Sequence, residues 1–185
     1  MPSRLSDRIW FDDSTTKVGL IRSALAPESR ILDIGAGPGY VTQLLQQEGH
    51  AVTGIDIANL SRIPDWTPTL YDGTTLSYTD GSFDTALLLT VLHHTSDPDA
   101  LLVEAARVAR QLIVIEDVHT HRLHKALTCF MDSLVNNEWR DHPHSNRSDA
   151  EWKAAFEHLG LELMSTQNRT ILRVFRQHIY RLTTA

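Results

Sequence analysis

Three glycines at alternate positions, Gly35, Gly37 and Gly39, follow an apolar stretch and precede a helical pattern. Glycine lets the backbone turn sharply and lets a ligand approach where a Cβ atom would collide. The N–H groups at the start of the next helix can receive a polar or anionic group, and Asp33 adds a carboxylate just before the loop. The pattern, which includes Ala36, predicts a cofactor-binding loop on a doubly wound α/β sheet. A plain strand-to-helix turn without a ligand is the alternative.

The spacing of these glycines argues against a dinucleotide-binding loop. The dinucleotide fingerprint is G-x-G-x-x-G, and Gly35 and Gly37 match its first two glycines. The third position holds Tyr40, and the remaining glycine comes one residue early, at Gly39. An NAD-dependent oxidoreductase is therefore disfavoured.

A second carboxylate, Asp56, closes the apolar pattern at 51–55, one strand–helix–strand unit after Asp33. A carboxylate can accept hydrogen bonds from both hydroxyls of a ribose, so Asp56 is a candidate for binding a nucleoside. Ile57 then stands where an apolar side chain can pack on adenine. A turn or capping aspartate is the alternative, but it does not explain the spacing.

Several motifs, in order along the chain, resemble those of one enzyme family. Asp33-x-Gly35-x-Gly37-x-Gly39 resembles the first motif of the class I S-adenosylmethionine (SAM)-dependent methyltransferases. Later motifs look like those of small-molecule methyltransferases related to the ubiquinone and menaquinone enzymes. They are Asp80-Gly-Ser-Phe-Asp84, Val91-Leu-His-His94, Asp97-Pro98 and Glu104-Ala-Ala-Arg-Val108. The resemblance runs from about residue 30 to 117.

The resemblance implies that the glycine loop cradles the methionine part of SAM, whose product is S-adenosylhomocysteine (SAH). In this family an acid after the third strand accepts from the adenine amino group, which makes Asp72, with Gly73, the candidate here. An Asp-Gly pair is also a simple turn signal. Thr90, after the fourth strand, completes the expected cofactor site.

The fold expected from this resemblance is α/β: a Rossmann-like, doubly wound, seven-stranded sheet, mostly parallel, with an antiparallel C-terminal hairpin. Predicted strands cover 30–34, 51–55, 69–72, 85–90, 111–117, 161–165 and 170–180, with Gln167-Asn168 as the hairpin turn. Residues 1–13 are expected to be a loosely tethered arm, followed by a helix from Ser14. The chain is expected to be one domain, 1–185, in which 118–148 forms a helical lid or substrate insertion around a long helix at 119–141.

Methyl transfer requires the protein to hold the nucleophile in line with the methyl group and to exclude water. A hydroxyl nucleophile also needs a base. Because ligands in open α/β sheets bind outside the carboxyl ends of the strands, His93 and Asp117 are expected to be neighbours there. Some sugar O-methyltransferases of the family use a His and an Asp at matching positions. We expect His93 to act as the base, with Asp117 orienting it or acting with it; packing and loop hydrogen bonding of the His-His pair is the alternative.

The acceptor pocket is expected in the lid, where the family varies its substrate contacts. Its predicted lining residues are His94, Trp139, His142, His144 and Asn146. A metal site built with Glu116 and Asp117 is an alternative, but histidines scattered on a helix are usually not ligands, and no metal is expected.

Composition limits the classes of function. The net charge of −6 disfavours a broad nucleic-acid surface, and no apolar run approaches the roughly 18 residues of a membrane span. The first eight residues lack a signal-peptide core, and Cys129 is the lone cysteine, which suits a reducing compartment. We expect a cytoplasmic enzyme that methylates a small molecule, most readily at oxygen. The alternative is a catalytically silent SAM-binding protein that regulates or scaffolds a partner.

Overall fold

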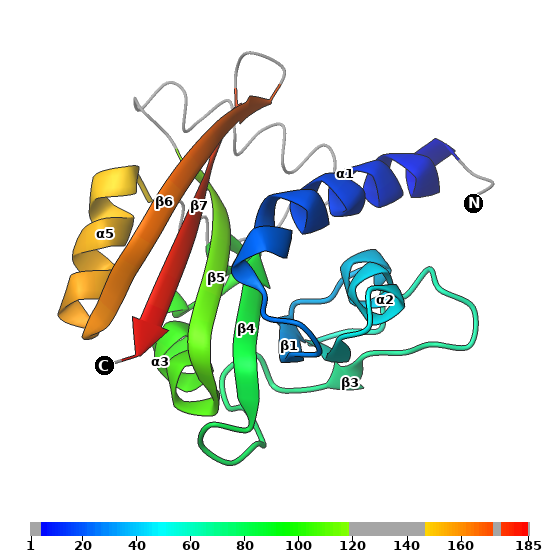
Figure 1. The fold of residues 1–185 in the computed structure, drawn as a ribbon, viewed down its shortest axis with the longest axis horizontal. Helices are drawn as coiled ribbons and strands as arrows, with labels where there is room; N and C mark the ends of the chain where they lie inside the picture. Colours follow the sequence, from blue (N-terminus) through cyan, green and yellow to red (C-terminus); the bar gives the residue numbers. More distant parts are fainter. Residues whose placement is uncertain (1–4, 119–146, 172–174, 185) are drawn as a thin grey trace.

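The computed structural model describes residues 5–118, 147–171 and 175–184 (Figure 1). In chain order the elements are α1 (Leu5–Ile21), η1 (Arg22–Ala24), β1 (Arg30–Ile34), α2 (Tyr40–Gln47), β2 (Ala51–Asp56), β3 (Thr69–Leu70), β4 (Phe83–Leu89), η2 (Leu92–His94), α3 (Pro98–Val108), β5 (Ala109–Val118), α5 (Asp149–His158), β6 (Leu161–Ile171) and β7 (Phe175–Thr184). Within these ranges, no helix combines the length and apolar character needed to cross a membrane.

The seven strands form one sheet in the order β3-β2-β1-β4-β5-β7-β6. β1 to β5 pair in parallel, whereas β7 is antiparallel to both β5 and β6. This confirms the Rossmann-like fold with an antiparallel C-terminal hairpin. The strand order reverses between β1 and β4, and ligands bind at such a switch point, beyond the carboxyl ends of the strands.

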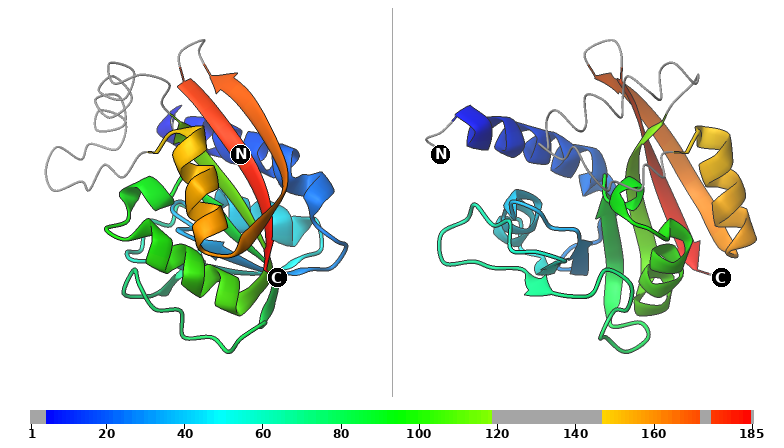
Figure 2. Two further views of the ribbon diagram at one scale, coloured as in Figure 1. Left: turned by 90° about the vertical axis from the view of Figure 1, so that its left-hand side faces the viewer. Right: turned by 180° about the vertical axis from the view of Figure 1, so that it is seen from behind.

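Helices cover both faces of the sheet (Figure 2). On one face, the apolar side chains of α1 and α2 pack with Ile113 and Ile115 of β5. On the other face, those of α3 and α5 pack with Leu112 and Val114. Successive side chains of a strand point to opposite faces. The adjacent acids Glu116 and Asp117 at the end of β5 therefore face opposite sides of the sheet.

Residues 5–13 do not form the predicted arm, because α1 begins at Leu5 and Ser14 lies inside it. Contacts with distant segments hold this first part of the helix. Phe11 packs edge-on against the ring of Tyr40, with 5.5 Å between ring centroids, and Asp7 pairs with Arg62. Both partners are distant in sequence, which is why local helix signals did not predict them.

The hairpin turn predicted at Gln167-Asn168 is also wrong. β6 continues to Ile171, and these two residues pair with Ile179 and His178 of β7. A Gln-Asn pair without glycine is a weak turn signal. Beside it, the Arg169 guanidinium donates two hydrogen bonds, of 2.8 and 2.6 Å, to Gln177 Oε1 across the hairpin.

The predicted helix starts after Asp97 and Ser148 are confirmed. The Asp97 carboxylate accepts from the backbone N–H of Ala100 at 2.9 Å, with Pro98 in the first turn. Ser148 and Glu151 form a reciprocal capping box at the start of α5. Both caps satisfy backbone donors that a helix start leaves without an intrahelical partner.

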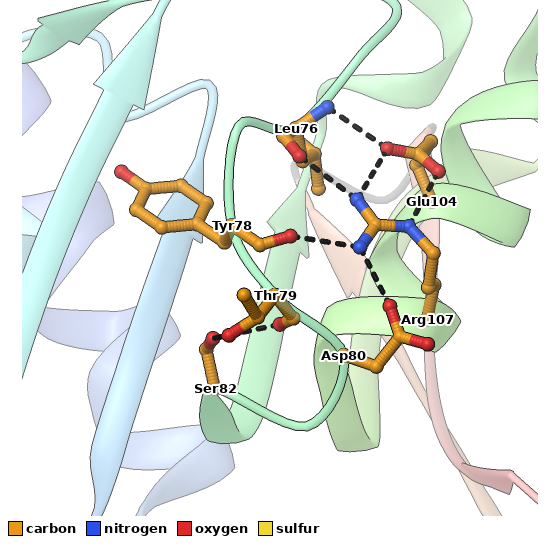
Figure 3. Close-up of polar contacts among 7 residues, drawn as sticks. All are labelled: Leu76, Tyr78, Thr79, Asp80, Ser82, Glu104 and Arg107. Atoms are coloured by element: carbon orange, nitrogen blue, oxygen red, sulfur yellow. Dashed lines mark hydrogen bonds and ion pairs between the residues drawn. The ribbon is translucent and has the colours of Figure 1, made fainter.

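Arg107 on α3 holds the irregular segment 71–82, which connects β3 to β4 (Figure 3). Its guanidinium donates to the backbone oxygens of Leu76 and Tyr78 and to the carboxylates of Asp80 and Glu104, at 2.7–2.8 Å. Glu104 also accepts from the Leu76 N–H at 2.9 Å. One fixed fork of donors therefore fastens the segment that contains Asp72 and Gly73 to α3.

We expect Arg107→Ala to lower the free energy of unfolding clearly more than an ordinary surface substitution does, because four hydrogen-bond acceptors lose their shared donor. Urea denaturation measures this, with Arg110→Ala, at an exposed position of β5, as the control. A change below about 0.5 kcal/mol, the usual range for surface substitutions, would show that the segment is held by other contacts.

Candidate cofactor and catalytic site

The glycine loop joins β1 to α2 with all three glycines at positive φ: 74° at Gly35, 52° at Gly37 and 87° at Gly39. A Cβ atom added to Gly35 would lie 2.4 Å from Val91 Cγ2, and one added to Gly39 would lie 2.4 Å from the Trp66 ring. A Cβ atom on Gly37 would approach only a backbone oxygen, at 4.0 Å. The outer glycines thus permit close packing, and the middle one borders open space that a ligand can occupy.

Asp33 supports the loop from beneath. Its side chain is buried and its Oδ2 atom accepts from Thr42 Oγ1 at 2.7 Å, which ties β1 to α2. Burial raises the pKa of Asp33 to about 6, and the Thr42 hydrogen bond and the nearby Lys17 charge oppose that rise. Asp33, which was predicted to bind the cofactor, therefore binds α2, the helix that follows the glycine loop.

Asp56 lies at the end of β2 and reaches the glycine loop. Its Oδ2 atom accepts from the Gly37 N–H at 2.8 Å, and Oδ1 accepts from the Ala58 N–H at 3.3 Å. A carboxylate has about four acceptor positions, so each oxygen keeps one for a further donor. Asp56 fits the binding of two sugar hydroxyls beside Gly37.

The predicted cofactor residues Ile57 and Gly73 come together at the same edge of the sheet. Ile57 is 67% exposed, an unusual state for an isoleucine, and a Cβ atom on Gly73 would lie 3.2 Å from its Cγ2. Asp72 Oδ1 accepts from the backbone N–H groups of Thr74 and Thr75, both at 2.8 Å, and these bonds lower the pKa of Asp72. Asp72 thus shapes the turn that brings Gly73 against Ile57.

Thr90, at the end of β4, has a φ of 61°. A β-branched residue rarely adopts this left-handed conformation, which costs about 1–3 kcal/mol. Its N–H donates to Ile115 O at 2.6 Å, and its Oγ1 atom accepts from Lys17 Nζ at 2.9 Å. Such strain at the carboxyl edge of a sheet marks a position that the surrounding structure holds in place.

Lys17 is a site residue that the sequence did not single out. It is only 8% exposed, and its Nζ atom also pairs with Asp13 at 2.9 Å. Asp13, Lys17 and Ile21 follow at four-residue intervals, so they share one side of α1. The four-residue spacing of Lys17 and the core residue Ile21 could have indicated that Lys17 is buried. That spacing is informative only if the helix also includes Asp13, which requires α1 to begin well before Ser14.

His93 forms a buried pair with Glu116. Its Nδ1 atom lies 2.6 Å from Glu116 Oε2, and Glu116 Oε1 accepts from the Leu92 N–H at 2.8 Å. With Nδ1–H donating to the carboxylate, Nε2 of a neutral imidazole is the basic nitrogen. His94 lies beside this pair, with 4.0 Å between the two imidazole centroids.

Glu116, and not the expected Asp117, therefore holds the His93 imidazole at Nδ1. Glu116 follows the alternation of Leu112 and Val114 toward the α3 and α5 face, so Asp117 points to the α1 face. Burial raises the pKa of Asp117, and nearby His93, a hydrogen bond from Gln177 and the Lys17 charge oppose the rise. Asp117 remains close to the site, but from the other side of the sheet.

The predicted acceptor residues Trp139, His142, His144 and Asn146 lie outside the described residues. After this segment, Arg147 donates to Asp99 of α3 at 2.6 Å and stacks over the Trp152 ring. Among residues 5–118, 147–171 and 175–184, no group of three or more His, Cys, Asp or Glu side chains is arranged to hold a metal ion.

Comparison with known proteins agrees with this geometry. Residues 11–166 match the family described as Methyltransferase domain. The chain therefore belongs to this family, and it is a class I SAM-dependent methyltransferase domain.

Two similar proteins carry named activities. The chain is 36% identical over 104 residues to the demethylmenaquinone methyltransferase of Tropheryma whipplei, covering 50% of this chain and 43% of that protein. It is 30% identical over 121 residues to the ubiquinone biosynthesis O-methyltransferase of Maricaulis maris, covering 60% and 46%. The chain thus spans less than half the length of these curated relatives.

A solved structure shares the fold at low sequence identity. Magnesium protoporphyrin IX methyltransferase from Synechocystis PCC 6803, solved with bound SAH, superimposes with a TM-score of 0.67 at 19% identity. The match covers 95% of this chain and 84% of that chain.

The raised pKa of Asp33 predicts a pH-dependent stability. Between about pH 4, the ordinary value for aspartate, and about pH 6, the native state binds the proton more tightly than the unfolded state. Raising the pH through this window therefore destabilises the wild type. Asp33→Asn keeps an oxygen for Thr42 but cannot titrate, so its stability relative to the wild type should rise by about 2–3 kcal/mol across the window.

Denaturation at a series of pH values measures this difference. Asp84→Asn is the control with the opposite sign, because Arg30 lowers the pKa of Asp84 to about 2, so that variant loses stability relative to the wild type as the pH rises from about 2 to 4. Parallel curves for Asp33→Asn and the wild type between pH 4 and 7 would contradict the burial of a titrating Asp33.

Proposed function

We propose that this chain transfers a methyl group from SAM to a small molecule, at oxygen. The observation that carries the proposal is the Asp56 carboxylate, which is fixed by Gly37 N–H, can still accept from a sugar, and lies at the same carboxyl edge of the sheet as the buried His93–Glu116 pair. The name of the Maricaulis maris relative, an O-methyltransferase, supports oxygen as the acceptor atom.

The residues present fit a nucleoside cofactor. Gly37 leaves space where a Cβ atom would meet almost nothing, Asp56 would accept from the ribose hydroxyls, and exposed Ile57 would pack on adenine. Asp72 and Gly73 lie at the adenine side. When bound, SAM supplies a methyl group activated by its sulfonium.

His93 is the proposed general base. An acceptor hydroxyl would lose its proton to Nε2 of His93 as its oxygen forms the new bond to carbon. Glu116 fixes the tautomer and stabilises the imidazolium that results, since it lies 2.6 Å from Nδ1. Asp117, across the sheet, adds negative charge near the same imidazole. The water-poor setting of the pair strengthens both interactions.

The acceptor pocket is proposed to be completed by His94 and by the lid residues Trp139, His142, His144 and Asn146. The Arg147–Asp99 pair fixes the end of the lid segment on α3, close to the η2 turn that carries His93 and His94. A lid over this edge would exclude water from the reacting hydroxyl.

Loss of the Asp56 carboxylate, the proposed hydrogen-bond acceptor for the ribose hydroxyls, should weaken SAH binding. We expect Asp56→Asn to raise the Kd for SAH by about 10- to 100-fold, because charge-assisted hydrogen bonds become neutral or are lost. Isothermal titration calorimetry measures the Kd. Asp84→Asn, which alters a carboxylate paired with Arg30, is the matched control and should bind like the wild type. Equal affinity of Asp56→Asn and wild type would reject the sugar-binding role.

Loss of the base should reduce turnover and leave cofactor binding intact. We expect His93→Ala to lower kcat by at least about 100-fold, with the Kd for SAH within threefold. Glu116→Gln should lower kcat less, because its amide no longer stabilises an imidazolium. Acceptors are found by screening metabolites for a gain of one methyl group. A near-normal kcat for His93→Ala would exclude the catalytic role.

A further inference from the structure

We infer that Lys17 of α1 is a positioning residue that couples the cofactor loop to the catalytic histidine through the hydroxyl of Thr90. The inference rests on the proposed function, because it assigns a role within that site. Lys17 is a buried cation that the proposed mechanism does not otherwise use, and its helix, α1, lies beside α2 (Figure 1).

The Thr90 hydroxyl has a defined orientation. It donates to Leu89 O at 2.6 Å, so its lone pairs are available to accept from Lys17 Nζ at 2.9 Å. These bonds hold the side chain of a residue whose φ of 61° is unfavourable for threonine. Lys17 therefore helps to fix the left-handed turn that ends β4.

The turn after Thr90 reaches both halves of the site. Val91 packs so closely on Gly35 that a Cβ atom there would lie 2.4 Å from Val91 Cγ2. The next two residues, Leu92 and His93, both bind the Glu116 carboxylate. A shift at Thr90 would therefore displace the glycine loop and the imidazole together.

Lys17 is itself held from several elements. Asp13 binds Lys17 at 2.9 Å and lies 3.4 Å from Arg169 of β6, which in turn donates to Gln177 of β7. Gln177 continues the network to Asp117. The ammonium thus sits in a fixed network on the α1 face, where its charge opposes the rise that burial causes in the pKa of Asp33 and of Asp117.

The test compares Lys17→Met, Thr90→Val and the double variant by calorimetry with SAH. Each single variant breaks the same link, so each should raise the Kd about tenfold, and the double variant should also show about tenfold and not 100-fold. Thr90→Ser keeps the hydroxyl and should bind within threefold of the wild type. Arg22→Met removes an exposed cation near the end of α1 and should bind like the wild type.

Titration with 5′-methylthioadenosine, which lacks the amino acid part of SAH, separates positioning from direct contact. If Lys17 acts by positioning the glycine loop and Asp56, Lys17→Met should weaken the binding of both SAH and 5′-methylthioadenosine. Weakening of SAH alone would mean direct contact of Lys17 with the amino acid part and would overturn the inference, as would additive effects in the double variant. If Lys17→Met does not fold, Thr90→Val still tests the link. Wild-type protein that ignores SAH would instead reject the proposed function.

Discussion

One hydrogen bond, from the backbone N–H of Gly37 to the carboxylate of Asp56, joins the carboxyl ends of β1 and β2. A carboxylate that is 7% exposed needs such partners, because an unpaired buried charge is strongly unfavourable. The bond orients the acid and positions the loop at once. Asp33 holds α2 from beneath through Thr42, so the geometry of the nucleoside side follows from these two buried acids.

The alternation of β5 separates the two chemical tasks of the site. Glu116 faces α3 and α5 and holds His93, whereas Asp117 faces α1, where burial raises its pKa and the Lys17 charge opposes that rise. Two adjacent acids at the end of a buried strand would repel strongly on one face. On opposite faces, Glu116 holds the proposed base, and Asp117 lies near the buried ammonium of Lys17, which donates to the Thr90 hydroxyl just after β4.

Features written in local sequence could be predicted, and features created by tertiary contacts could not. The glycine spacing, the acid after β2 and the caps at Asp97 and Ser148 depend on a few adjacent residues. The first half of α1 depends on Phe11 meeting Tyr40, a contact across 29 residues. The choice of Glu116 over Asp117 depends on which face of the sheet each residue occupies, and β5 is apolar toward both faces, so its pattern did not reveal this.

The most direct measurement is a crystal structure of the chain with SAH bound. We predict that both ribose hydroxyls lie within hydrogen-bond distance of Asp56, that adenine packs against Ile57, and that the Gly37–Asp56 hydrogen bond is retained. A nucleoside bound elsewhere, or one whose ribose avoids Asp56, would contradict the account.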